Sequence, residues 1–358
     1  MRTLFPALLV WIGLINAHPC PLQALEASPA GRATPLLRGI WQMFLSDYMT
    51  PDGRVIDTGN RGITHSEGQG YAMIMAVRAE DRASFDRIWS WTKINLWIRE
   101  DDLFAWAWDP ASQPHVFDTD DASDGNILIA WALLEGASLW HDVTYRVEAQ
   151  KILEAVWDRN VVTTRFGPTL LPGARGFGAL DRPDGPVVNL SYWVFPALER
   201  FVQVDKTRNW QAVIESGLQL VNSARFGPRK LPSDWISLAH DRIAPAENFP
   251  AVFGYDVIRV PLYLAWARPR ARQLLAIFET VSNRSSSRPL SVVEVSTGSA
   301  VEALDEDGYE AIGALLRCVL RNTPVGRKFL AVKKERYYPT TLHILSLLAV
   351  AEVRPDCL

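Results

Sequence analysis

Hydrophobic residues recur along most of this chain with the period of an α-helix. Between residues 213 and 221 they fall at i, i+1, i+4, i+5 and i+8, which places them on one helix face. Phe85, Ile88, Trp89 and Leu96 mark a second face of this kind. The same pattern predicts further helices near residues 36–48, 66–79, 124–140, 143–157, 190–204, 255–267, 270–282, 308–321 and 340–352. These are about eleven helices with no alternation of strand and helix, so no parallel sheet is expected.

One β-hairpin is predicted among the helices. Residues 161–164 and 169–171 read as strands, and residues 165–168 contain the Gly-Pro turn between them. No change in composition divides the region from 35 to 352. We therefore expect a single all-α domain over 35–352, a toroid of helical hairpins with a small β-hairpin insertion, followed by a tail at 353–358.

The first 24 residues have the pattern of a secretory signal peptide. Arg2 supplies a positive start, and residues 4–15 form an apolar core too short to cross a membrane. Cleavage is expected after Ala17 or Ala24, and residues 25–34 read as a linker. We expect a periplasmic or secreted protein that is not embedded in a membrane and is a monomer. The formal net charge of -3 does not indicate nucleic-acid binding.

Three cysteines occur in the sequence, and removal of the signal peptide leaves Cys318 and Cys357. An exported protein can form a disulfide between them. Cys318 lies in an apolar helical run, however, so a buried free thiol is the favoured expectation. The six histidines show no H-x-x-x-H spacing, and no metal site or cofactor is expected.

The stretch from 58 to 77 places one carboxylate, Glu67, between a glycine-rich polar approach and an apolar run. Such a boundary suits a general acid that must hold its proton near neutral pH. The simpler alternative is a capping box, because Thr64 and Glu67 have the spacing T-x-x-E. In a capping box Glu67 would accept a hydrogen bond from the Thr64 amide and stay ionised. The glycines at 68 and 70 lack the third glycine of a dinucleotide-binding loop.

Polar segments between the helices combine acids with aromatic residues. They span residues 106–110, 118–126, 189–193, 231–235 and 253–261. Taken singly, each has an ordinary explanation: Ser123 or Asp124 can cap a helix, 118–121 can bind Ca²⁺, and Asp256 can pair with Arg259 at i, i+3. Taken together, and with fourteen tryptophans in the chain, they indicate a sugar-binding groove at one end of the toroid.

At these segments the sequence resembles the bacterial glycoside hydrolases of family 8. The resemblance covers roughly residues 35–350, and four motifs occur in the family's order. They are the segments 66–71, 122–130, 189–192 and 255–261. The resemblance implies an (α/α)6 barrel that hydrolyses β-1,4-glucans with inversion.

The resemblance also implies roles for individual residues. Glu67 corresponds to the general acid and Asp256 to the general base, and Asp124 to the acid that holds the sugar at the cleavage point. The family commonly has a second Asp two residues later, where this chain has Asn126, so local pKa tuning and the pH optimum are open. The further candidates for substrate binding are Asn126, Arg259, and the aromatic residues Trp106, Trp108, Tyr192 and Trp235, each of which could equally be part of the core.

The sequence therefore predicts an endo-β-1,4-glucanase, or cellulase, that acts on a β-1,4-glucan chain. A cellulose synthase complex is expected as a further partner. Other specificities of the family remain open, namely chitosanase, lichenase or xylanase. A glucan-binding protein without catalysis is disfavoured because it needs neither Glu67 nor Asp256. A polysaccharide lyase is disfavoured because the motifs are rich in carboxylates rather than in Arg, Asn or His.

Overall fold

Helices dominate the computed structural model, which describes residues 35–239, 241–268, 270–279, 281–282 and 290–358. These residues belong to a single unit. The predicted signal peptide and linker lie outside them. The described residues form α1 (Pro35–Tyr48), α2 (Ser66–Arg78), α3 (Arg82–Asn95), α4 (Ser123–Trp140), α5 (Val143–Asn160), α6 (Phe195–Val204), α7 (Trp210–Ser223), α8 (Arg259–Ala267), α9 (Arg272–Glu279), α10 (Asp307–Arg321), α11 (Arg327–Leu330) and α12 (Tyr337–Val353).

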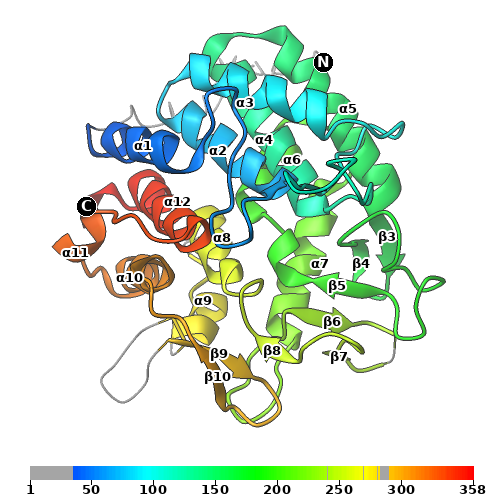
Figure 1. Cartoon of the computed structure of the whole chain (residues 1–358). Helices are drawn as coiled ribbons and strands as arrows, with labels where there is room; N and C mark the ends of the chain where they lie inside the picture. Colours follow the sequence, from blue (N-terminus) through cyan, green and yellow to red (C-terminus); the bar gives the residue numbers. More distant parts are fainter. Residues whose placement is uncertain (1–34, 240, 269, 280, 283–289) are drawn as a thin grey trace, which may run out of the picture. The chain divides into compact units, whose positions relative to one another are not determined.

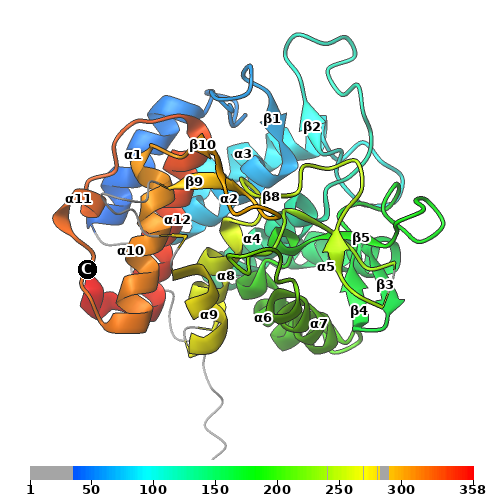
Figure 2. The same ribbon diagram turned by 90° about the horizontal axis from the view of Figure 1, so that it is seen from below.

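Alternate helices form a closed inner ring (Figures 1 and 2). Contacts run from α2 to α4, α6, α8, α10 and α12, and α12 returns to α2. The other helices pack outside this ring, α3 on α2, α5 on α4, α7 on α6, α9 on α8, α11 on α10, and α1 against both α2 and α12. This arrangement is an (α/α)6 barrel, and it confirms the predicted fold class. No helix within the described ranges is both long and apolar enough to span a lipid bilayer.

The inner helices are buried on nearly all sides, as a helix enclosed by others must be. Every residue of α2 is buried except Glu67. In α12 the buried run extends from Pro339 to Val350 without interruption. Outer helices such as α7 bury one face only, through residues that include Val213, Ile214 and Val221. Glu67 thus stands out as the single accessible position of an otherwise enclosed helix.

Small antiparallel sheets connect the helices. The predicted hairpin is confirmed as β3 (Val161–Thr164) and β4 (Gly167–Leu170), with a tighter turn than expected. The remaining strands are β1 (Thr64–His65) paired with β2 (Ala107–Trp108), β5 (Val187–Asn189) and β7 (Ala244–Pro245) on either side of β6 (Trp235–Ser237), and β8 (Val252–Phe253) and β10 (Ala300–Ala303) on either side of β9 (Ser291–Glu294). At two to four residues each, these strands are too short to show a period in the sequence.

Two predicted helices begin later than expected. The helix predicted over 190–204 is divided into a 3₁₀ turn, η1 (Leu190–Tyr192), and α6. Pro196 has no amide hydrogen to donate to the carbonyl of Tyr192, so a continuous helix cannot form there. The helix predicted over 255–267 begins at Arg259, because the backbone amides of Gly254 and Val257 instead donate to the Asp234 carboxylate at 2.9 and 3.0 Å.

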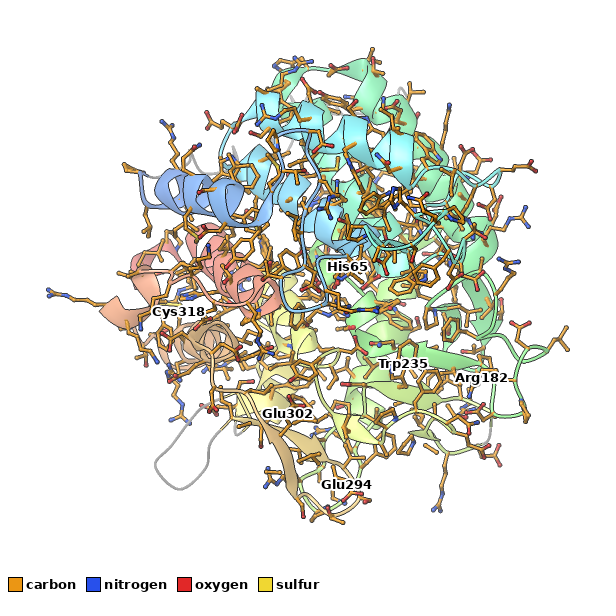
Figure 3. All side chains as sticks on the ribbon, viewed as in Figure 1. His65, Arg182, Trp235, Glu294, Glu302 and Cys318 are labelled. Carbon is orange, nitrogen blue, oxygen red and sulfur yellow. A yellow bond between two sulfur atoms is a disulfide. The ribbon has the colours of Figure 1, made fainter. Side chains whose placement is uncertain are left out.

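The expectation of a free thiol is wrong, because Cys318 and Cys357 form a disulfide with their Cα atoms 6.1 Å apart. After α12 the predicted tail forms a 3₁₀ turn, η2 (Pro355–Cys357), which brings Cys357 to α10. The Val325 amide donates to the Cys357 carbonyl at 2.8 Å, and Arg354 donates to the Cys318 carbonyl at 3.2 Å. Cys318 is buried, as its apolar surroundings suggested, and Figure 3 labels its position among the C-terminal helices.

Candidate active site

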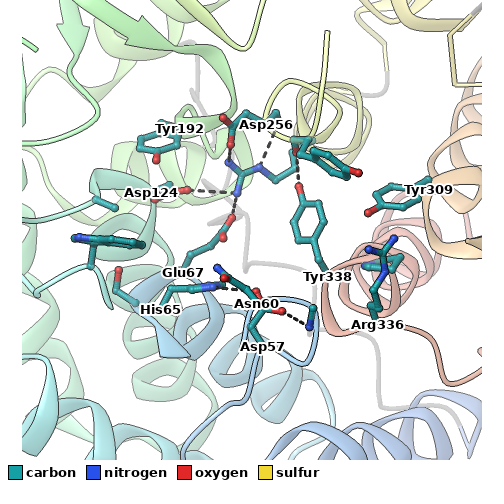
Figure 4. A pocket seen from close by; sticks show the side chains of 17 residues that line it. Asp57, Asn60, His65, Glu67, Asp124, Tyr192, Asp256, Tyr309, Arg336 and Tyr338 are labelled. Atoms are coloured by element: carbon teal, nitrogen blue, oxygen red, sulfur yellow. Dashed lines mark hydrogen bonds and ion pairs between the residues drawn. The ribbon is translucent and has the colours of Figure 1, made fainter. Parts of the chain in front are cut away.

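A cavity of about 470 Å³ opens at one end of the ring, where the inner helices begin (Figure 4). Each inner helix contributes a side chain from its first turn or from the turn just before it. These residues are Glu67 in α2, Asp124 in α4, Tyr192 in η1 ahead of α6, Arg259 in α8, Tyr309 in α10 and Tyr338 in α12. Residues from all along the chain therefore meet in one place.

Short strands deliver the chain to several of these helix starts. β1 ends at His65, directly before α2, and β5 ends at Asn189, directly before η1. β8 ends at Phe253, three residues before Asp256. Unpaired backbone N–H groups at helix starts favour acidic side chains. The cavity is thus built where the fold itself tolerates carboxylates.

Glu67 does not cap its helix, so the capping-box alternative is wrong. The Thr64 hydroxyl instead donates to the Val55 carbonyl at 2.6 Å. The Glu67 Oε1 atom accepts a hydrogen bond from the Tyr71 hydroxyl at 3.0 Å and also contacts the Arg259 guanidinium. The side chain of Glu67 lines the cavity.

Arg259 is the centre of the carboxylate cluster. Its Nη1 atom lies 3.4 Å from Asp124 Oδ2, and its Nη2 atom lies 3.2 Å from Asp256 Oδ1. Nη2 also donates to the Ser191 hydroxyl at 2.6 Å. The ion pair that the i, i+3 spacing of Asp256 and Arg259 allows is present, but Arg259 shares its charge among three carboxyl groups, including Glu67. One cation against three acids leaves the cluster short of positive charge.

Two acids of the cluster retain their protons at higher pH than isolated acids do. Burial raises the pKa of Asp124 to about 8, and the neighbouring charge of Asp256 adds to the rise. Burial also raises the pKa of Asp256 to about 6, although the nearby side chains of Asn189 and Trp235 oppose the change. The Glu67 side chain is 16% exposed and that of Asp256 is 31% exposed, so Glu67 is the better shielded of the two.

Two of the predicted aromatic residues reach the cavity. Trp106 lines it, and its indole nitrogen donates to Asp118 Oδ2 at 2.9 Å. Tyr192 also lines it, with the Arg259 guanidinium 5.9 Å from the ring centroid. Both rings are anchored by protein contacts and border open space.

Trp108 and Trp235 are not among the residues that line the cavity. The Trp108 ring packs against Trp91 and His115, at centroid distances of 5.7 and 4.3 Å. Trp235 stacks on Phe177 and Phe249 at interplanar angles of 12° and 13°. Each of these two tryptophans thus packs against other rings of the protein.

Asn126 is also away from the cavity lining. It is fully buried, its side-chain oxygen accepts a hydrogen bond from the Phe104 amide at 2.9 Å, and its nitrogen donates to Asp121 Oδ2 at 3.1 Å. Asn160 donates to the same carboxylate oxygen at 2.9 Å. Asn126 therefore supports the packing below Asp124, and its side chain cannot contact a sugar in the cavity.

Most of the acidic run at 118–121 is engaged by protein groups. Asp120 pairs with Arg175, and the buried Asp121 carboxylate accepts the Ala174 amide at 2.8 Å. Ser123 and Asp124 are not caps either, because the cap position of α4 is Ala122. The Ser123 hydroxyl donates to the Leu171 carbonyl at 2.7 Å.

Sequence reasoning missed the side of the cavity formed by the C-terminal helices. Tyr309, Arg336 and Tyr338 line it, and the Tyr338 hydroxyl donates to the Tyr255 carbonyl at 2.5 Å. His65 and Asp57 also line the cavity, with His65 Nε2 3.1 Å from Asp57 Oδ2. The tyrosine pair at 337–338, placed between a basic run and an apolar helix, is the signal that could have revealed this side.

An acid cluster in an aromatic cavity at the end of an (α/α)6 barrel defines a class of protein, the glycoside hydrolases that cleave with a pair of carboxyl groups. The model of one family, "Glycosyl hydrolases family 8", matches residues 22–352. The chain belongs to this family, whose members cleave glycosidic bonds with inversion.

Individual relatives agree with the family assignment. The chain is 39% identical over 277 residues to a probable endoglucanase of Novacetimonas hansenii, a match that covers 76% of this chain and 80% of the relative. It is 35% identical over 260 residues to an endoglucanase of Cellulomonas uda, covering 71% and 72%. Among solved structures, the family 8 endoglucanase Cel10 of Klebsiella pneumoniae superimposes with a TM-score of 0.80 at 33% identity, covering 88% of this chain and 100% of that one.

Proposed function

We propose that this chain is an endo-β-1,4-glucanase in which Glu67 is the general acid and Asp256 the general base. The observation that carries the proposal is the meeting of Glu67, Asp124 and Asp256 around one guanidinium in the cavity. A binding protein would have no use for three acids that share one cation, because burying them costs stability. A pair of carboxyl groups in different protonation states is what hydrolysis with inversion requires.

In the proposed reaction Glu67 gives its proton to the glycosidic oxygen as the bond from that oxygen to C1 breaks. Asp256 removes a proton from a water molecule that attacks C1 from the opposite face of the sugar. With its pKa raised to about 6, Asp256 is mostly ionised at neutral pH and can act as this base. Asp124, with a pKa of about 8, is mostly protonated there and can donate a hydrogen bond to a sugar hydroxyl.

For the substrate we propose a β-1,4-glucan chain, with Trp106 and Tyr192 as the rings that stack on glucose. Both line the cavity. Arg259 then acts by holding the acids rather than by contacting the sugar, and Trp108, Trp235 and Asn126 support the loops beneath. The endoglucanases among the relatives favour this substrate over chitosan, lichenan or xylan.

We further propose that the chain is exported and works as a monomer on glucan outside the cytoplasm. The apolar pattern of residues 4–15 and the disulfide between Cys318 and Cys357 support export, because disulfides persist in oxidising compartments. A role beside a cellulose synthase complex is part of the same proposal.

The test is release of reducing ends from carboxymethylcellulose, with chitosan, lichenan and xylan assayed in parallel. We expect Glu67→Gln and Asp256→Asn to lose turnover by about 100-fold or more while they fold normally. Glu154→Gln is the matched control, because Glu154 is a 66% exposed acid on the outer helix α5. Wild-type turnover in either site variant would refute the assignment of that residue, and faster hydrolysis of another polysaccharide would refute the substrate.

A further inference from the structure

A tyrosine that has no role in the proposed reaction steps contacts the carboxyl group of Glu67. Tyr71 lies one turn after Glu67 on α2, and its side chain is fully buried in the barrel core. Its hydroxyl donates to Glu67 Oε1 at 3.0 Å. Tyr263, on α8 and also buried, forms a hydrogen bond with the Tyr71 hydroxyl.

The direction of these hydrogen bonds follows from the number of protons available. A tyrosine hydroxyl has one proton to donate. If Tyr71 donates it to Glu67, then Tyr71 must accept the proton of Tyr263. The two residues thus form an ordered chain from α8 through α2 to the carboxyl group of Glu67, and this chain runs inside the ring of helices.

Both donors that contact Glu67 meet the same oxygen. The Tyr71 hydroxyl and the Arg259 guanidinium are directed at Oε1. A carboxyl oxygen that accepts two hydrogen bonds is a poor site for a proton, because the proton would face two donors. The acid proton of Glu67 is therefore favoured on Oε2.

We propose that Tyr71, held in place by Tyr263, is a positioning residue that keeps the acid proton of Glu67 on Oε2 for transfer to the glycosidic oxygen. The proposal rests on the function proposed above. It assigns to Tyr71 no contact with the sugar. Its effect should consequently be confined to the step that needs an acid.

The experiment compares Tyr71→Phe and Tyr263→Phe with wild type on two soluble substrates. One is a cello-oligosaccharide, whose leaving group needs protonation, and the other is the corresponding dinitrophenyl glycoside, whose leaving group departs without an acid. Tyr145→Phe is the matched control, because Tyr145 also donates to a carboxylate, that of Asp86, but between the outer helices α5 and α3.

For Tyr71→Phe we expect kcat on the cello-oligosaccharide to fall about tenfold or more, the scale of a hydrogen bond to a charged group, with KM little changed. The alkaline limb of the kcat/KM profile should move to higher pH, because the lost donor stabilises ionised Glu67. Turnover of the dinitrophenyl glycoside should stay near the wild-type value. Tyr263→Phe should change each quantity in the same direction by less, and Tyr145→Phe should change none.

Equal losses on both substrates, or an unmoved alkaline limb, would overturn the proposal and leave Tyr71 as a packing residue. Glu67→Gln, assayed beside it, separates this failure from failure of the proposed function. If Glu67→Gln keeps wild-type turnover of the cello-oligosaccharide, Glu67 is not the acid and both proposals fall. If Glu67→Gln loses that turnover while Tyr71→Phe matches wild type, the assignment of Tyr71 alone is wrong.

Discussion

At the scale of single residues, burial at helix starts sets the chemistry of the acids. Burial raises the pKa values of both Asp124 and Asp256, and for Asp124 the charge of neighbouring acids adds to the rise. Asp234, just outside the cavity, has its pKa raised to about 7 by burial and by the charge of Asp256. Its carboxylate holds the turn that carries Asp256. The acid cluster therefore extends one layer behind the cavity surface.

The raised pKa of Asp256 predicts the acid limb of the pH profile. A base works only when ionised, so activity should be lost as pH falls through about 6. Below that value kcat/KM should drop about tenfold per pH unit. The measurement is initial rates from pH 4 to 9 on a soluble glucan. A profile still flat at pH 4.5 would mean that Asp256 has an ordinary pKa or is not the base.

Motifs in the sequence located the residues of this cluster, but they did not show which side chains face the cavity. Glu67, Asp124, Asp256 and Arg259 occur in short segments that already combine unusual residues. Trp108, Trp235 and Asn126 occur in the same segments, yet none of them is among the residues that line the cavity. Their direction depends on partners such as Phe177 and Phe104, which no local pattern connects to them.

At the scale of elements, the site depends on where helices begin. The helical period predicted the inner helices well, since their long apolar runs are plain in the sequence. It did not predict the late starts of α6 and α8, because the hydrophobic period does not register the effect of Pro196 or of the distant Asp234 carboxylate, which accepts hydrogen bonds from backbone amides before α8. The delay gives Tyr192 and Asp256 their positions at the cavity.

The disulfide joins the segment just after α12 to α10. These two helices are neighbours in the inner ring. It closes a loop with a sequence separation of 39 residues. We expect Cys357→Ser to lower the free energy of unfolding by about 2–4 kcal/mol, because the open chain gains conformational entropy when unfolded. Turnover at low temperature should be unchanged, since neither cysteine lines the cavity.

Denaturant titration of wild type and Cys357→Ser, each with and without a reductant, measures this effect. The difference between them should disappear once the wild-type disulfide is reduced. Equal stability of the two proteins under oxidising conditions would show that the bond contributes nothing.

At the scale of the whole barrel, ionic contacts fix the end away from the cavity. Arg78, the last residue of α2, pairs with Glu135 of α4 at 2.9 Å and with Glu352 of α12 at 2.6 Å. The Trp266 indole of α8 donates to Glu352 at 2.8 Å. Four inner helices are thus joined at their C-terminal ends, and their N-terminal ends are free to hold the acids.

In the proposed mechanism Glu67 and Asp256 act from opposite faces of one sugar. The most direct test is proton NMR of the first product formed when the enzyme cleaves a β-1,4-linked cello-oligosaccharide, recorded before mutarotation. Inversion predicts that the new reducing end appears first as the α-anomer. Initial appearance of the β-anomer would contradict it, because Asp256 would then have to act as a nucleophile rather than as the base that activates water.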